Sequence, residues 1–188
     1  MNDNLYMIGG LKIRIKTEYA FPCPPHVAAF LSMSNGEKAD VEIRILSEKD
    51  FNYAVTDKRY EDSDWFSVYE TENGDNIFSF IADKICCVTH LYIPHTGNNI
   101  EIYIDNNLLT ENSISIIETT PFLMCFMIIL IKYNGIILHS SGVIMENKGF
   151  IFCGKSGSGK TTISNLFIKS NYAKVLTDEA LILRKHEN

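Results

Sequence analysis

One glycine-rich stretch, GKSGSGKTT at 154–162, constrains the fold more than any other part of this 188-residue sequence. It satisfies the pattern GxxxxGK followed by Ser or Thr, which is typical of phosphate-binding loops. In such a loop the glycines let successive amides face phosphate oxygens, the lysine adds a positive charge, and the hydroxyl binds Mg²⁺. We therefore expect the whole stretch to bind ATP and Mg²⁺ through Gly154, Lys155, Ser156, Gly157, Ser158, Gly159, Lys160, Thr161 and Thr162.

The residues around this loop supply the structural context that the pattern requires. An apolar run at 150–153 predicts a strand before the loop, and 161–169 predicts a helix whose N-terminal dipole faces the same anions. Two further short strands are expected at 136–138 and 142–145. The second of these is joined to 150–153 by the turn ENKG, so an antiparallel strand should lie beside the strand that carries the loop.

An acidic pair follows the predicted helix. Residues 173–176 and 180–184 read as strands on either side of Thr177-Asp178-Glu179. A strand, a helix and a returning strand form a unit whose two strands run parallel, so Asp178 and Glu179 should arrive beside the phosphate loop. This position suits a metal ligand or a general base. The alternative is that the acidic pair occupies a solvated turn between two strands.

The N-terminal part of the chain is β-rich. Residues 11–17 and 41–46 alternate apolar with polar side chains, and two hairpins are expected, at 64–71 with 76–82 and at 86–93 with 100–105. We expect an antiparallel meander over 1–110 as an N-terminal lobe. The phosphate-loop core should follow over 111–188, with the boundary near 106–113.

The segment 122–131 is apolar throughout and predicts a buried helix. Thr119 or Thr120 can cap it, Pro121 suits its first turn, and Asn134-Gly135 can end it. Its ten residues are too few for a membrane span, which needs roughly 20. A membrane partner is therefore not expected.

Charge and cysteine content restrict the partners and the compartment. The formal net charge of −6 disfavours nucleic acid as a partner, because it repels a polyanionic backbone. Five cysteines are present, without a CxxC pair, and no secretory leader is visible, so a cytoplasmic location is expected. They are Cys23, Cys86, Cys87, Cys125 and Cys153.

The stretch LHSSGVIMENKGFIFCGKSGSGKTTISNLF at 138–167, followed by VLTDEALIL, resembles the HPr kinase/phosphorylase family and its relatives in the phosphoenolpyruvate carboxykinase-like superfamily. The resemblance covers roughly 135–184. In these proteins a histidine precedes an antiparallel pair of strands, the phosphate loop follows, and an acidic pair closes the next strand. The resemblance implies an α/β protein whose core is a mixed sheet of the carboxykinase-like type.

The resemblance also implies an activity, namely ATP-dependent phosphorylation of a serine in a small protein or peptide, which can run in reverse. By the same likeness Asp178 is the catalytic base and a metal position, Glu179 and Thr161 contact Mg²⁺, and His139 acts near the transferred phosphate. Two residues depart from the family pattern. Glu179 stands where an aspartate is usual, and Thr161 stands where many members have serine.

The family continues well beyond its acidic pair, whereas this sequence ends at Asn188. The expectation is either a truncated member or a remainder supplied by another subunit. The strand at 180–184 would then be an open edge, and a homo-oligomer would cover it. Two alternative functions remain: a non-catalytic nucleotide-binding module that works through a partner, and a metabolic carboxykinase-like enzyme. The last is least favoured, because no arginine cluster for a small carboxylate is visible.

Overall fold

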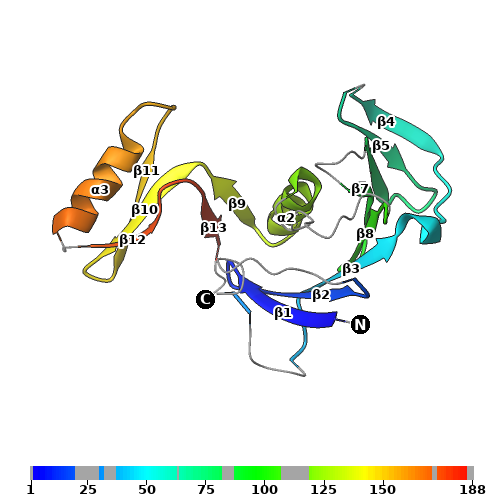
Figure 1. Ribbon diagram of the computed structural model, residues 1–188, viewed down its shortest axis with the longest axis horizontal. Coiled ribbons are helices and arrows are strands. Elements are labelled where there is room, and N and C mark those ends of the chain that lie inside the picture. Colours follow the sequence, from blue (N-terminus) through cyan, green and yellow to red (C-terminus); the bar gives the residue numbers. More distant parts are fainter. Residues whose placement is uncertain are drawn as a thin grey trace. The chain divides into compact units, whose positions relative to one another are not determined.

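The computed structural model describes residues 2–19, 30–31, 37–62, 64–81, 87–106, 119–170 and 173–185. The expected boundary at 106–113 lies outside these ranges except for Asn106. The chain divides into two compact units, Met1–Phe126 and Met127–Asn188. The described residues form an α/β structure with a large mixed sheet and two α-helices, α2 (Thr120–Lys132) and α3 (Lys160–Ser170) (Figure 1).

The first unit contains an eight-stranded sheet with the order β1-β2-β3-β8-β7-β6-β5-β4 (Figure 1). The 3-10 turn η1 (Glu48–Asp50) follows β3. The strands are β1 (Asn2–Ile8), β2 (Leu11–Thr17), β3 (Val41–Ser47), β4 (Asp57–Glu61), β5 (Phe66–Glu70), β6 (Asn76–Phe80), β7 (Val88–Ile93) and β8 (Asn99–Ile104).

Alternation along the central strands creates a buried apolar face. In β2 the side chains of Leu11, Ile13 and Ile15 are buried, while the lysine and arginine side chains between them are partly exposed. Because paired residues share a face of the sheet, the register continues this face across the neighbouring strands. Its further members are Ile43, Ile45, Leu91, Ile100, Ile102 and Ile104.

The expected all-antiparallel meander is wrong for two strand pairs. Strand β3 runs parallel to β2 on one side and parallel to β8 on the other. Residues 18–40 separate β2 from β3, which is long enough for the crossover that parallel strands need. The hairpins β5–β6 and β7–β8 are confirmed, and Gly74 takes a positive φ of 79° in the first of their turns.

Two strands were missed by the sequence analysis. Strand β1 pairs with β2 through a Gly9-Gly10 turn in which both glycines have positive φ, and this dipeptide is a recognised hairpin signal. Strand β4 is exposed at every position and carries four charged residues among five, so it shows no apolar alternation. Charged side chains are typical of a sheet edge that must avoid pairing with other chains.

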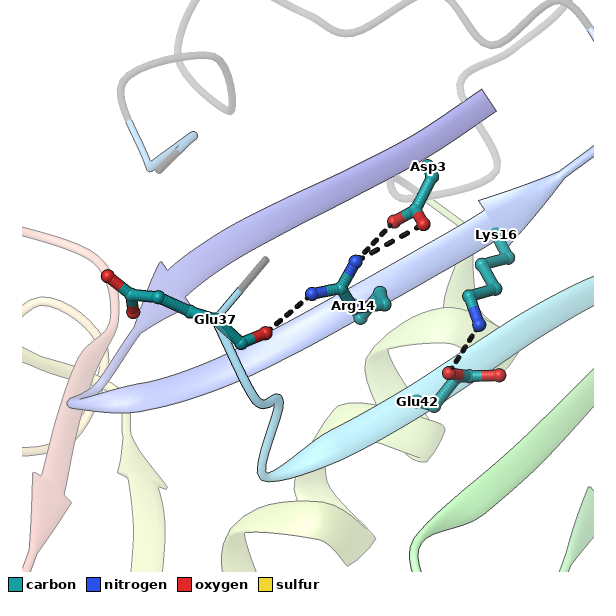
Figure 2. A network of polar contacts seen from close by, with 5 residues as sticks. All are labelled: Asp3, Arg14, Lys16, Glu37 and Glu42. Carbon is teal, nitrogen blue, oxygen red and sulfur yellow. Dashed lines mark hydrogen bonds and ion pairs between the residues drawn. The ribbon is translucent and has the colours of Figure 1, made fainter. Parts of the chain in front are cut away.

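The opposite face of the sheet is polar and carries ion pairs that link neighbouring strands. Figure 2 shows Arg14 donating to Asp3 Oδ1 and Oδ2 at 2.9 and 3.2 Å and to the carbonyl oxygen of Glu37 at 2.6 Å. In the same view Lys16 Nζ lies 2.7 Å from Glu42 Oε2. These contacts join β1, β2 and β3 across their solvent side.

Glu101, on the same polar face, is buried. It accepts a hydrogen bond from Tyr53 Oη at 2.8 Å and further bonds from Tyr103 and Arg44. Burial opposes ionisation of this carboxyl, but the hydrogen bonds from Tyr103 and Tyr53 and the Arg44 charge outweigh it. The pKa of Glu101 therefore lies below its ordinary value.

The second unit contains two small sheets. One has the order β11-β10-β12, with β10 (Ser140–Met145), β11 (Lys148–Cys153) and β12 (Lys174–Thr177), and the other pairs β9 (Gly135–Leu138) with β13 (Leu181–Arg184). Helix α3 packs on one face of the first sheet (Figure 1). The predicted strands are confirmed, although β10 begins at Ser140, two residues earlier than expected.

The strand at 181–184 is not wholly open as predicted. Strand β13 pairs antiparallel with β9, from Leu181 opposite Leu138 to Arg184 opposite Gly135. One edge of β13 is thus satisfied within the chain. Its other edge has no strand beside it in the described part of the chain.

Helix α2 confirms the predicted helix and its ends, but not its full burial. Leu123 donates its amide to the Thr119 carbonyl at the start, and Asn134 takes a left-handed φ of 55° just after the end. One stripe of the helix is buried, whereas Leu123, Met127 and Ile131 are exposed. Among the described residues no helix combines the length and the apolarity that a membrane crossing needs. Cys87, Cys125 and Cys153 are free thiols, and Cys23 and Cys86 lie outside the described residues.

Candidate functional site

The predicted strand, loop and helix occur in that order. Strand β11 ends at Cys153, and α3 begins at Lys160, one residue before the predicted start. Gly157 and Gly159 have φ values of 78° and 91°, in the left-handed region that favours glycine. At Gly154 a side chain would displace Ser158, because an added Cβ would lie 3.1 Å from Ser158 Cβ and closer still to its hydroxyl.

Lys160 is buried at the start of α3, and its ammonium group is held by the loop. Its Nζ donates to the carbonyl oxygens of Gly154 at 2.7 Å and Lys155 at 3.3 Å. A buried lysine needs such partners, because burial of an unpaired charge is costly. The first amides of a helix also have no acceptor within that helix, so the loop and the first turn together form a positive site.

Sheet topology brings the remaining candidates to the same edge. Strand β10 is antiparallel to both β11 and β12, so β11 and β12 are parallel to each other, as predicted, with β10 between them. The carboxyl ends of β11 and β12 and the start of β10 therefore meet. The phosphate loop follows β11, the acidic pair Asp178-Glu179 follows β12, and His139 directly precedes β10.

A cavity of about 360 Å³ lies at this edge. Every residue that lines it is polar or glycine, and no Phe, Tyr, Trp or hydrocarbon side chain of the described residues contributes. Two members of the predicted set, Gly154 and Lys155, are outside the lining. The lining residues are His139, Ser156, Gly157, Ser158, Gly159, Lys160, Thr161, Thr162, Asp178 and Glu179.

Thr177 shapes the acidic turn, a role that the sequence analysis missed. Its Oγ1 accepts hydrogen bonds from the amides of Glu179 at 3.2 Å and Ala180 at 3.4 Å. A threonine that accepts from an amide two residues ahead is a known local turn motif, so the signal was available in the sequence. The amide of Ser140 also donates to the Glu179 carbonyl at 3.2 Å, which ties the turn to β10.

The carboxylates of Asp178 and Glu179 suit Mg²⁺ bound together with phosphates better than a metal held by protein alone. Among the described residues no group of three or more His, Cys, Asp or Glu side chains is placed to hold a metal ion. Mg²⁺ in phosphoryl-transfer sites uses only one or two carboxylates and completes its shell with water and substrate phosphates. Thr161, Asp178 and Glu179 line the same cavity and fit that arrangement.

Comparisons with protein-family models, with curated proteins and with solved structures found no match to this chain.

Proposed function

We propose that this protein is an ATP-dependent serine kinase that acts on a small protein or peptide and has a phosphate-loop core of the carboxykinase-like type. One observation carries the proposal: residues of the phosphate loop, His139 and the pair Asp178-Glu179 line a single cavity. The phosphate loop alone supports nucleotide binding. The acidic pair at the same cavity adds a base and metal ligands of the kind that phosphoryl transfer to a hydroxyl uses, and His139 lies beside them.

The residues divide the proposed reaction between them. The loop and Lys160 hold the phosphate chain, and Mg²⁺ bound beside Thr161 and Glu179 offsets developing negative charge. Asp178 accepts the proton of the serine hydroxyl while the serine oxygen forms a bond to the γ-phosphorus. The bond from the γ-phosphorus to the β–γ bridging oxygen breaks, and ADP leaves with those electrons. His139, which is exposed at the cavity, is assigned to the transferred phosphate.

The polar lining bears on donor recognition. Among the described residues, glycine and polar side chains supply the whole lining. Such a lining suits phosphates and a metal ion better than a purine ring. The resemblance to HPr kinase/phosphorylase proteins supports serine as the acceptor. A cytoplasmic location and a homo-oligomer joined through the second edge of β13 remain predictions.

A second candidate is a nucleotide-binding module that works through a partner. Ser141 and Phe152 are paired, and Phe152 stacks on Phe167 of α3 with ring centroids 5.8 Å apart, so these residues face the helix. Ile151 is next to Phe152, and Ile144 is three residues after Ser141, so by alternation both point to the other face, and both are exposed. Exposed apolar side chains on a sheet face favour an interaction with another protein.

Calorimetric titration with ATP and Mg²⁺ tests the nucleotide site that both candidates share. Replacing Lys160 with alanine removes the charge held in the loop, and we expect affinity to fall by about tenfold or more, the effect of one charge-assisted hydrogen bond. Lys169→Ala, in the last turn of the same helix, is the matched control and should bind as the unmodified chain does. Equal affinity in all three proteins would remove the proposal.

A further inference from the structure

Two buried serines connect the helix of the phosphate loop with the strand that leads from His139. Ser164 Oγ in α3 donates to Ser141 Oγ in β10 at 2.8 Å, and the two residues are 2% and 0% exposed. Ser164 lies four residues after Lys160, so both side chains are on the same face of the helix. This face of α3 packs on β10.

The hydroxyl of Ser164 donates across to β10 and not within its own helix. A serine in a helix interior can donate to the carbonyl group four residues earlier, which here belongs to Lys160. Ser164 instead donates to another element. Apolar contacts between α3 and β10 would bury this surface but would not fix the position of the helix along the strand, because the hydrophobic effect is non-directional. A hydrogen bond at one point defines how far the helix lies along the strand.

The elements that the bond joins carry the two halves of the site. The first turn of α3 holds Lys160, Thr161 and Thr162, which belong to the phosphate side. On β10 the residue before Ser141 is Ser140, and the Ser140 amide donates to the carbonyl oxygen of Glu179 at 3.2 Å. Ser164 is therefore about one helical turn after Lys160, and Ser141 is one residue after the amide that bonds to the acidic turn.

We propose that Ser141 and Ser164 are a pair of positioning residues that set the spacing between the phosphate loop and the acidic turn. Neither serine is among the residues that line the cavity. Their role is to let one nucleotide meet Lys160 and the carboxylates of Asp178 and Glu179 at the same time. The proposal rests on the function proposed above.

Hydrogen exchange of the Ser140 amide tests the pair without any ligand. Ser164→Ala should speed exchange at Ser140 by about tenfold, although Ser140 lies on another element, because one bond that holds β10 to α3 is lost. The double variant Ser141→Ala/Ser164→Ala leaves no lone buried hydroxyl and should fold stably, yet it should show the same acceleration. Asn165→Ala, exposed on the same helix, should exchange as the unmodified chain does. Unchanged exchange in both serine variants overturns the proposal.

Calorimetric titration of ATP with and without Mg²⁺ then tests the consequence for the site. The double variant should bind metal-free ATP within about twofold of the unmodified chain, because the phosphate loop is intact. The ratio of ATP affinity with Mg²⁺ to ATP affinity without it should fall by about tenfold, because the carboxylates of the acidic turn no longer reach the Mg²⁺ that is bound to the nucleotide. A full Mg²⁺ effect in the double variant contradicts the positioning role. If the unmodified chain binds no ATP under either condition, the proposed function fails, and the exchange experiment still decides the serine pair.

Discussion

The amide nitrogen of Ser140 lies 3.2 Å from the carbonyl oxygen of Glu179. This bond fixes the acidic turn to the start of β10, directly beside His139. The acidic turn is therefore tied to β10, and both of its acidic residues line the same cavity as residues of the phosphate loop.

Replacing Glu179 with glutamine should weaken the dependence of phosphoryl transfer on Mg²⁺. The side chain keeps its size but loses the negative charge that a hard cation prefers, so a higher Mg²⁺ concentration should be needed for half-maximal activity. Glu146→Gln, exposed in the turn between β10 and β11, is the control and should leave the Mg²⁺ requirement as it is. A Mg²⁺ titration of single-turnover rates makes the comparison. Identical curves for the Glu179 variant and the control would exclude Glu179 as a metal ligand.

Replacing His139 with alanine should reduce turnover and leave nucleotide affinity almost unchanged. A group that contacts charge only as the phosphate is transferred contributes to the rate rather than to binding, and its loss costs about 10²-fold in such sites. His95→Ala, exposed in the first unit, should have no effect on either quantity. The rate is measured by rapid quench and the affinity by calorimetry. A variant with weaker binding and a normal rate would assign His139 to binding instead.

Gly154→Ala should impair nucleotide binding, because the new Cβ would press on the Ser158 side chain and displace the loop. Gly149→Ala is the control, since a Cβ at Gly149 meets nothing within 4 Å. Nucleotide-dependent thermal stabilisation reports the effect. In the double variant Gly154→Ala/Ser158→Gly the crowding is relieved, and part of the stabilisation should return; if it does not, crowding is the wrong explanation.

Glu101 should make the stability of the first unit depend on acid pH. Its pKa is lower in the folded chain than in the unfolded chain, so its stabilisation is present above the unfolded pKa and is lost as pH falls through the folded value. Glu101→Gln should lower the free energy of unfolding at pH 7 by about 1–3 kcal/mol and flatten its fall below pH 4.5. Urea denaturation followed by circular dichroism measures both quantities.

The control for Glu101 is Glu42→Gln, which breaks a partly exposed ion pair with Lys16 on the same polar face. Pairs of this kind contribute about 0–1 kcal/mol, so this variant should be nearly neutral. If both substitutions lower the free energy of unfolding equally, burial of Glu101 does not make it more stabilising than the partly exposed Glu42.

Local patterns allowed much of the fold to be predicted. The alternation in β2 and β3 identified both strands and their buried faces, and the glycine loop between an apolar strand and a helix identified the start of α3. The position of Asp178 and Glu179 beside the loop also followed, because the direction of β12 depends only on the order of strand, helix and strand.

Other features depend on tertiary packing that local patterns do not contain. Alternation shows which face of β3 is buried but not whether the strand runs parallel to β2, and the length of the connection at 18–40 was the available signal. The bond between Ser141 and Ser164 depends on where α3 lies along β10. Two serines 23 positions apart carry no sign of it in the sequence.

The central claim is phosphoryl transfer at this cavity, and single-turnover transfer from γ-labelled ATP tests it most directly. The acceptors are a degenerate peptide library with a fixed serine and the same library with alanine at that position. We predict label in the serine library only, a fall of about 10² to 10⁴ in rate for Asp178→Asn, and nucleotide affinity preserved in that variant. Tight ATP binding with no more label in the serine library than in the alanine library would contradict the kinase and leave a nucleotide-binding module.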